Sequence, residues 1–388
     1  MITREALRIA HEQCQFIGTV DRQYDSSFAQ TGAKIGTTLR VRKPNQYIRT
    51  TGSRVMDVQD QTEAKIDVTV ATQDHVDMRF NSAELALSLD DISKRYIEPA
   101  VKVLVSGIES DFLAYATKAT PNLVGVDNTA ITTLSIPGQA RARMNQFLAP
   151  KSDRSVQMDS MTMAGLVNGM AAYCAPQAAI GEQFKEGLVA RTSMADYYEN
   201  ERVWNLANST DVAFQLNSFT VTEGCITYTV SNWATPNAGM VVQFTGINAV
   251  HPETKADLGF AKTFTVVAGS TATSMVLSPP LYGPASGALQ NVVSLPTTTN
   301  AITAWGTASK TYVNPLMYHK EAFTFVTADL PLMDDAAKCV RRTQDGLSLR
   351  VWQASDIRND ELLMRIDILY GMAALRPEWA CRMAGVYQ

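Results

Sequence analysis

Histidine, cysteine and carboxylate side chains are the residues of this sequence that could carry out catalysis or hold a metal ion. The four histidines, His11, His75, His251 and His319, are scattered along the chain, and no two have the spacing of metal ligands. His319 stands beside aromatic residues in the stretch MYHKEAF, so we expect it to be packed or hydrogen-bonded. The five cysteines are widely spaced without a CxxC pair, which argues against a zinc site and a disulfide framework. We therefore expect no metal and no cofactor.

Sequence motifs of enzymes are missing as well. The chain contains no HExxH, GxSxG, GxxxxGK or GxGxxG stretch. The acids between positions 57 and 77 could form acid–base pairs, but acids on exposed strands are usually solvated. Met158, Met161, Met163 and Met170 lie close together and are typical of adaptable core packing. The sequence thus gives no positive evidence for an enzyme.

Length and composition narrow the class of protein further. The 388 residues suggest two or three structural units, and 46% of them are apolar, which is enough for a large core. The net charge of −4 lacks the basic footprint of a dedicated nucleic-acid-binding protein. The N-terminal stretch is too polar for a signal peptide, and no segment reaches the roughly 20 apolar residues of a membrane span. We expect a soluble protein made in a reducing cytosol.

Charged residues separate by sign within the extended segment 34–80. Its first part contains only bases, namely Lys34, Arg40, Arg42, Lys43, Arg49 and Arg54. Its second part contains Asp57, Asp60, Glu63, Asp67, Asp74 and Asp77 against Lys65 and Arg79. Alternating β-branched residues predict paired strands here. The segment is either a solvated hairpin with cross-strand ion pairs, which the pattern alone favours, or a projecting loop that docks on complementary charge in another copy.

Two helices are predicted in the first third of the chain. Residues 2–17 carry an apolar stripe at helical spacing, which needs a partner surface on its own domain or on a neighbouring subunit. Residues 90–118 form the longest predicted helix, with a kink expected at Pro99 and a stop signal at Pro121. Its predicted buried face consists of Ile92, Tyr96, Ala100, Val103, Gly107, Ile108 and Phe112.

A change of composition marks residues 211–309, where few charges remain and Thr, Val, Ser, Gly and Ala dominate. Stretches such as FTVTEGCITYTV and GMVVQFTGINAV, split by Gly, Pro and Asn turns, predict a small barrel or sandwich. Neither flank looks complete by itself, so we expect this all-β module to be inserted into a mixed α+β domain. Two long strand candidates, GLSLRVWQASD and LLMRIDILYGMAAL, follow near the end.

The order of these segments resembles that of the tailed-bacteriophage capsid fold named after Hong Kong phage ninety-seven. Within that fold, the chain is similar to the coat-protein family of podophage P-twenty-two. The early part of the resemblance rests on TTLRVRKP, EAKIDVTVATQDHVDMRF and LDDISKRYIEPAVKVLVSGIESDFL. The later part rests on VNPLMYHKEAFTFVTADLP and on GLSLRVWQASDIRNDELLMRIDILYGMAALRPE, with its Tyr370-Gly371 and Arg376-Pro377-Glu378.

The resemblance implies a domain organisation. The ranges are an N-terminal arm (1–33), an extended loop with adjoining strands (34–80), a peripheral domain with a spine helix (81–120), a first axial part (121–210), an inserted β domain (211–305), a second axial part (306–344), a long C-terminal hairpin of the peripheral domain (345–376) and a C-terminal segment (377–388). It also implies that the extended loop reaches an adjacent subunit, which favours docking over the solvated hairpin. The inter-subunit contact residues would be Arg40, Arg42, Lys43, Arg49, Arg54, Asp57, Asp60 and Glu63.

The function that the resemblance implies is that of a major capsid protein without catalysis. Such a protein self-assembles as hexamers and pentamers into the icosahedral head around double-stranded DNA. The implied partners are a scaffolding protein during assembly, a portal protein at one vertex and packaged DNA through non-specific contact, with no membrane. The implied place is the virion, after assembly in the host bacterial cytoplasm.

Two alternatives remain beside the capsid hypothesis. The first is a carbohydrate- or receptor-binding phage surface protein, with the Thr-rich module and Trp233 as its binding head. The second is an enzyme with an unfamiliar active site, which would need a concave pocket with perturbed titratable groups.

Overall fold

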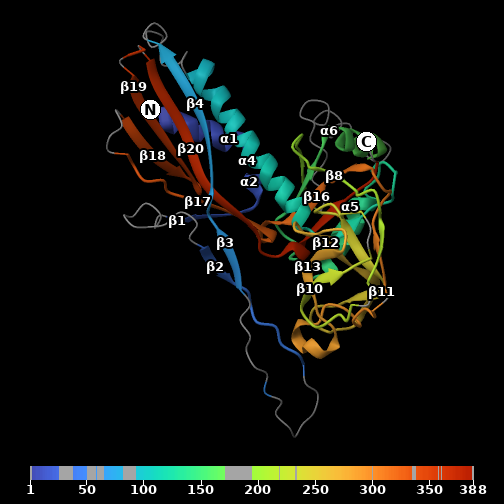
Figure 1. Ribbon diagram of the computed structural model, residues 1–388. Helices are drawn as coiled ribbons and strands as arrows, with labels where there is room; N and C mark the ends of the chain where they lie inside the picture. The colour runs from blue at the N-terminus through green and yellow to red at the C-terminus, as the bar shows by residue number, and fades with distance from the viewer. Residues whose placement is uncertain are drawn as a thin grey trace. The chain divides into compact units, whose positions relative to one another are not determined.

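The computed structural model describes residues 2–25, 38–49, 58, 65–81, 93–170, 195–217, 219–231, 234–298, 300–333, 338–356, 358–359 and 361–386. The described part is an α+β fold with more strands than helices (Figure 1). The chain divides into two compact units. The helix–sheet unit consists of Met1–Arg42, Lys65–Phe112 and Phe323–Leu375, and the barrel unit consists of Lys43–Ala64, Leu113–Ala322 and Arg376–Gln388.

The helix–sheet unit is built around one large sheet. The strands of the large sheet are β1 (Asp21–Asp25), β4 (Thr72–Asn81), β17 (Phe323–Ala328), β18 (Lys338–Gln344), β19 (Leu347–Asp356) and β20 (Glu361–Ala374). The unit also contains β2 (Thr38–Arg42) and β3 (Lys65–Thr69). The central strand β20 pairs antiparallel with β4, β19 and β17, while β18 pairs with β19 and β1 runs parallel to β17. The strands β2 and β3 form a separate antiparallel pair. The two long strands predicted near the end of the chain, β19 and β20, are therefore the middle of the sheet.

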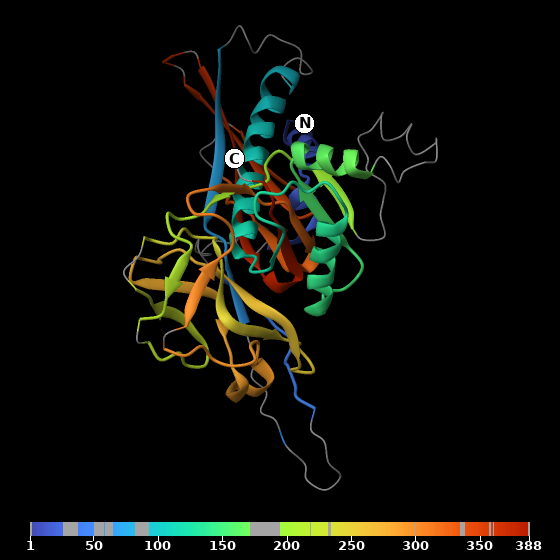
Figure 2. The same cartoon turned by 90° about the vertical axis from the view of Figure 1, so that its right-hand side faces the viewer.

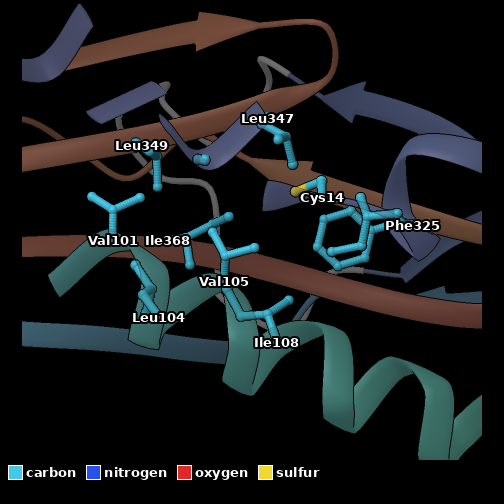
Figure 3. Close-up of a pocket in the computed structure, with 11 residues that line it drawn as sticks. Cys14, Val101, Leu104, Val105, Ile108, Phe325, Leu347, Leu349 and Ile368 are labelled. Atoms are coloured by element: carbon cyan, nitrogen blue, oxygen red, sulfur yellow. The ribbon is translucent and has the colours of Figure 1, made fainter. Parts of the chain in front are cut away.

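Side chains alternate between the two faces of β20, as strand geometry requires. Met364, Ile366 and Ile368 are buried on one face, whereas Arg365 and Asp367 extend from the other. Helices cover the apolar face, and a cavity of about 20 Å³ remains between helix side chains such as Leu104 and the strands (Figure 3). One hydrophobic core of this unit therefore lies between its helices and one face of the sheet, and a second cluster, with Leu369, Ala328 and Val68, lies on the opposite face.

The N-terminal helix packs on its own unit. Its elements are α1 (Ile2–Gln13) and α2 (Phe16–Thr19), so the single helix predicted over residues 2–17 is interrupted at residues 14–15. Ala6, Leu7, Ile9 and Ala10 are buried, and α1 contacts β18 and β19. Of the two predicted partner surfaces, the apolar stripe therefore uses the one in its own chain.

The buried stripe of the longest helix agrees only in part with the predicted one: Ala100, Ile108 and Phe112 are buried as predicted. Its elements are η3 (Ser93–Ile97) and α4 (Glu98–Ala119), and the predicted start at residues 90–92 lies outside the described residues. Val101, Leu104 and Val105 are buried, whereas Val103, predicted to be buried, is 66% exposed. Pro99 lies at the junction where the π-helical turn η3 passes directly into α4, so the helix has already begun before this proline. The missing N–H of Pro99 coincides with this change of helix type, and the expected kink stays a prediction.

The large sheet crosses a predicted domain boundary. The ranges 306–344 and 345–376 were expected in different domains, but β17 pairs with β20 and β18 pairs with β19. The structure divides the chain after Ala322 instead and places Phe323–Leu375 in the helix–sheet unit. Pairing between strands far apart in the sequence leaves no local signal, which explains the misplaced boundary.

The barrel unit contains a mixed sheet, a barrel and short helices. Its helices and turns are α5 (Ser135–Gln146), α6 (Ser160–Met170), η4 (Pro284–Leu289), η5 (Lys320–Ala322) and η6 (Pro377–Trp379). The mixed sheet consists of β5 (Leu123–Val124), β6 (Arg154–Met158), β7 (Asp196–Glu199), β16 (Leu316–His319) and β21 (Ala380–Met383). Its order is β5-β21-β16-β6-β7, so the C-terminal strand β21 is an interior strand, and α5 packs against it.

An antiparallel barrel fills the middle of the barrel unit (Figure 2). Its strands are β9 (Ala213–Gln215), β10 (Cys225–Thr229), β11 (Val241–Val250), β12 (Asp257–Val266), β13 (Ser274–Leu281) and β14 (Ala301–Ala304). The strand order is β10-β13-β12-β11-β14-β9, and a bridge between Leu216 and Val230 closes the ring. The chain enters and leaves through β8 (Asn205–Ala207) and β15 (Thr311–Val313), which pair with each other. The six barrel strands thus lie within the range in which the all-β module was expected, between segments that form the mixed sheet.

A fragment of residues 205–313 should fold by itself into this barrel. Its core consists of its own side chains, with Phe244 packed against Tyr228 and Phe264, and β8–β15 pairing joins its ends. Circular dichroism should give a β spectrum with a cooperative thermal transition. In the matched variant F244A, loss of the central ring should lower the free energy of unfolding by about 3–5 kcal/mol. A helical or random-coil spectrum for the unmutated fragment would contradict a self-contained module.

Candidate functional site

The strand pair β2–β3 presents the basic residues that were predicted to contact another subunit. Arg40 lies opposite Asp67, with 3.6 Å between Nε and Oδ1, and its side chain is 67% exposed. Arg42 lies opposite Lys65, so two like charges face each other across the strands. The residues between these charges, Leu39, Val41 and Ile66, point to the other face and pack against the apolar cluster around Val68. The pair therefore has one buried apolar face and one exposed face with excess positive charge.

The remaining predicted contact residues are only partly described. Lys43 and Arg49 follow β2 in extended chain, and Arg49 is exposed. Four further members of the predicted set lie outside the described residues, namely Arg54, Asp57, Asp60 and Glu63. The acid that the structure brings to Arg40 is Asp67, which was not in the predicted set. Strand register, which pairs Arg40 with Asp67, could have identified it from the two alternating stretches.

Lys43 also lines a large groove in the described part of the barrel unit. This groove has a volume of about 540 Å³. Its aromatic walls are Tyr47, Phe147 and Trp379, and its charged residues are Lys43, Arg376, Glu253 and Glu378. None of its lining residues is a serine, threonine, cysteine or histidine. The groove is large enough for a ligand, but it lacks the usual nucleophiles and the usual general base.

A buried carboxylate joins the N-terminal helices to α4. Glu109 is fully buried, and its Oε1 accepts hydrogen bonds from the backbone N–H groups of Phe16 at 2.8 Å and Ile17 at 3.4 Å. These N–H groups belong to the first turn of α2, where no helical acceptor exists. The rings of Phe16 and Phe112 pack beside them at 4.8 Å between centroids. Glu109 therefore caps α2 and holds it on α4.

Replacing Glu109 by leucine should loosen the N-terminal helices selectively. The two buried N–H groups would lose their acceptor, which should cost about 1–3 kcal/mol. Hydrogen exchange of the intact protein should then be faster over residues 2–19. E98Q, which removes a half-exposed carboxylate bound to Lys102 on the same helix, is the matched control and should leave this exchange unchanged. Equal protection of residues 2–19 in E109L and the unmutated protein would show that the carboxylate does not hold the helices.

A buried ion pair fixes the register of the large sheet. Arg350 on β19 donates from Nε to Oδ1 of Asp367 at 3.0 Å and from Nη2 to Oδ2 at 2.5 Å. Asp367 on β20 also accepts from Gln73 on β4 at 3.1 Å, and Arg350 donates to the carbonyl of Pro331. A one-residue slip of β20 would move Asp367 to the opposite face and break all these bonds. The pair is thus a register lock for three neighbouring strands.

Arg382 on β21 joins three distant parts of the barrel unit. Its guanidinium is fully buried and donates to the carbonyl of Thr120 from Nε at 2.8 Å and Nη2 at 2.6 Å, and to the carbonyl of Gly239 from Nη1 at 2.7 Å. Thr120 follows the last turn of α4, where free carbonyls and the helix dipole favour a cation. Gly239 has a φ of 97° and lies against the Lys118 side chain, so only glycine fits there without strain. Burial lowers the pKa of Arg382 to about 9, which leaves the side chain charged at neutral pH.

The other residues considered for chemistry have structural surroundings. His319 is buried, lies edge-on to Trp379 with 5.5 Å between ring centroids, and has a pKa lowered by that burial. The expected packed role is therefore confirmed. Among the described residues, no three His, Cys, Asp or Glu side chains come together as a metal site. Four of the cysteines lie in the described part, and none of these four forms a disulfide bond there.

The predicted core role of the methionines is correct only in part. Met158 and Met163 are buried in the core of the mixed sheet, as predicted, but Met161 is 81% exposed. That part of the prediction was wrong because Met161 lies on the outer side of α6. Within the part of the chain that the structure describes, every helix is too short or too polar to cross a membrane.

Comparisons with known proteins give one family match and several similar solved structures. Residues 207–386 match the family model described as P22 coat protein, gene protein 5. No curated protein matches the chain in sequence. Similar solved structures include the capsid of Ralstonia phage GP4, with 7% identity, a TM-score of 0.49, and coverage of 95% of this chain and 87% of that chain. The capsid of the cyanophage P-SCSP1u has 11% identity, a TM-score of 0.47, and coverage of 95% and 87%.

The family match covers the barrel, the strands β16 and β21 of the mixed sheet and the long strands β19 and β20, so this part of the chain is similar to a phage coat protein. The similarity to the P22 coat-protein family that the sequence predicted is confirmed over residues 207–386, which run from the start of the barrel to the C-terminal strand. The alternative of a receptor-binding surface protein is not supported, and Trp233, on which it depended, lies outside the described residues.

Proposed function

We propose that the protein builds the icosahedral head of a tailed bacteriophage around double-stranded DNA. The observation that carries the proposal is the match of residues 207–386 to the P22 coat-protein family model. Copies would associate as hexamers and pentamers around a scaffolding protein, in the cytoplasm of a bacterial host, with a portal protein at one vertex. With a net charge of −4, the protein would contact packaged DNA only weakly and without reading its sequence.

We also propose that the subunit carries out no catalysis. Several buried titratable groups bind backbone groups, as Glu109 and Arg382 do, or pair across strands, as Arg350 and Asp367 do. The groove beside Lys43 has no serine, threonine, cysteine or histidine in its lining. These arrangements favour stability over chemistry.

The exposed basic face is proposed as one half of a contact between subunits. Arg40, Arg42, Lys43 and Arg49 would meet acidic groups of a neighbouring copy, with Asp57, Asp60 and Glu63 as partners and Arg54 on the basic side. Two observations support this role: Arg40 is largely exposed beside a single acid, and Arg42 lies opposite Lys65. A shell subunit must offer both partners of every contact, which suits a segment whose charges separate by sign.

Negative-stain microscopy and sedimentation of the expressed protein test the proposed function. The expected result is closed shells, sheets or capsomer rings, with little free monomer at low ionic strength. Monodisperse monomers or trimers at every protein concentration would contradict a shell-forming subunit.

A further inference from the structure

Four side chains form a reciprocal contact between the barrel and the end of α5, within the barrel unit. The guanidinium of Arg143 lies over the ring of Phe260 at 3.5 Å from its centroid, and the ammonium of Lys262 lies over the ring of Phe147 at 4.5 Å. The two rings meet edge to face, with 6.2 Å between centroids. We call these four residues the cation–ring joint.

The spacing of the four residues follows from their elements. Arg143 and Phe147 are four residues apart at the end of α5, so they lie on one side of the helix. Phe260 and Lys262 are two residues apart on β12, so they lie on one face of the strand. Each side thus supplies one cation and one ring. The barrel docks on α5 through two cation–π contacts that cross each other.

The cation–ring joint contains more positive than negative charge. Lys262 is only 4% exposed, and the charged groups that face it are Glu378 of η6, which attracts it, and Arg143, which repels it. Arg143 Nη1 is buried and finds no hydrogen-bond acceptor among the described residues. The nearby thiol of Cys381 has a pKa raised to about 12 by burial, so it adds no negative charge at neutral pH. Two cations therefore share one carboxylate in a buried place, which is unfavourable.

We propose that the cation–ring joint is a charge-regulated contact: the barrel docks weakly while Lys262 is charged and strongly once Lys262 is neutral. A neutral amine keeps only van der Waals contact with the Phe147 ring and loses the cation–π attraction, but it also removes the desolvation of the ammonium and its repulsion by Arg143. In this nearly buried place we expect the desolvation and the repulsion to outweigh the cation–π attraction. The docking strength of the barrel in each subunit would then change between about pH 8 and pH 10.5, independently of how subunits contact one another.

The direction of the pH effect follows from the proton affinities. Burial lowers the pKa of Lys262 from 10.5 to about 8. Between these two pH values the unfolded chain binds more protons than the folded one, so stability rises as the pH rises from about 8 to 10.5. Below about pH 8 both states are charged, and the penalty is fully present.

Urea unfolding of the full-length protein and of K262M tests the proposal at pH 7 and pH 10. K262M should be the more stable protein at pH 7. The ratio of its folding equilibrium constant to that of the unmutated protein should fall on the order of fiftyfold between pH 7 and pH 10. K262R should keep its disadvantage relative to K262M at both pH values, because its guanidinium remains charged. K320M, which removes an exposed lysine of the same unit, controls for the loss of one charge.

Two results would overturn the proposal: a difference between K262M and the unmutated protein that is the same at both pH values, or a K262M less stable at pH 7. A direct measurement on the unmutated protein keeps the test valid if K262M does not fold. The ¹³Cε resonance of Lys262 should titrate with a midpoint near pH 8, and a midpoint near pH 10.5 would refute charge regulation.

Discussion

Replacing Arg382 by alanine should unfold the barrel unit, or destabilise it by about 3–5 kcal/mol. The substitution removes three hydrogen bonds to the carbonyls of Thr120 and Gly239 and leaves a cavity where the guanidinium lay. Both carbonyls would be buried without a donor, and the end of α4 would lose the cation that faces it. Because β21 lies between β5 and β16, loosening this strand would disturb the whole mixed sheet.

Thermal and urea unfolding of the full-length protein, followed by circular dichroism, measure the effect. R382K is the informative matched variant, since a lysine keeps the charge but cannot reach both carbonyls with a planar fork. It should fall between R382A and the unmutated protein. R358A removes an exposed arginine at the β19–β20 turn and should change the melting temperature little. A melting temperature of R382A within 2 °C of the unmutated value, on the order of what 0.5 kcal/mol produces, would show that the carbonyls find other donors.

Reversing Arg40, Arg42 and Lys43 to glutamate should abolish shell formation while the subunit stays folded. These side chains are exposed or half-exposed, so their loss should change the stability of the monomer little. Between copies, each exposed ion pair contributes only about 0.2–1 kcal/mol, but the contacts repeat at every interface of a shell. Reversal would convert every such attraction into a repulsion.

Light scattering and electron microscopy of R40E/R42E/K43E should therefore show folded protein and no shells. K320E/K338E/R342E changes the charge of three other exposed bases equally and should still assemble. Assembly of the unmutated protein should weaken as salt is raised, because screening acts over roughly 8–10 Å at physiological ionic strength. Normal shells from the first triple variant would refute the contact. A subunit that unfolds would show that these bases are needed inside their own strand pair.

The elements with strong periodicity could be predicted from the sequence. The barrel was recognisable because residues 211–309 combine few charges with frequent turn residues, and the strands β19 and β20 alternate clearly. The sequence could not show which valine of α4 is buried, because Val101 and Val103 are both apolar and only the packing against the sheet distinguishes them. The pairing of β17 with β20 depends on segments that are distant in the sequence.

The buried charges could not be predicted because their partners are backbone groups or aromatic rings of distant segments. Arg382 binds carbonyls 262 and 143 residues away, and nothing in the stretch WACRMAG identifies them. Lys262 stands alone in the apolar stretch GFAKTFTVV, which is a signal for a buried charge, but its ring partner Phe147 lies on a different element. The exposed bases at positions 40–43 could be predicted because they lie in a stretch with clear strand alternation. Asp67 follows from the same alternation once the strand register is known.

An icosahedral reconstruction of particles formed by the expressed protein would decide whether this chain is a capsid subunit. We expect closed shells in which hexamers and pentamers of this chain form the lattice, with the Arg40–Lys43 segment of each copy against acidic side chains of a neighbour. Particles without icosahedral order, or a protein that stays monomeric under all salt conditions, would contradict the assignment of this chain as a capsid subunit.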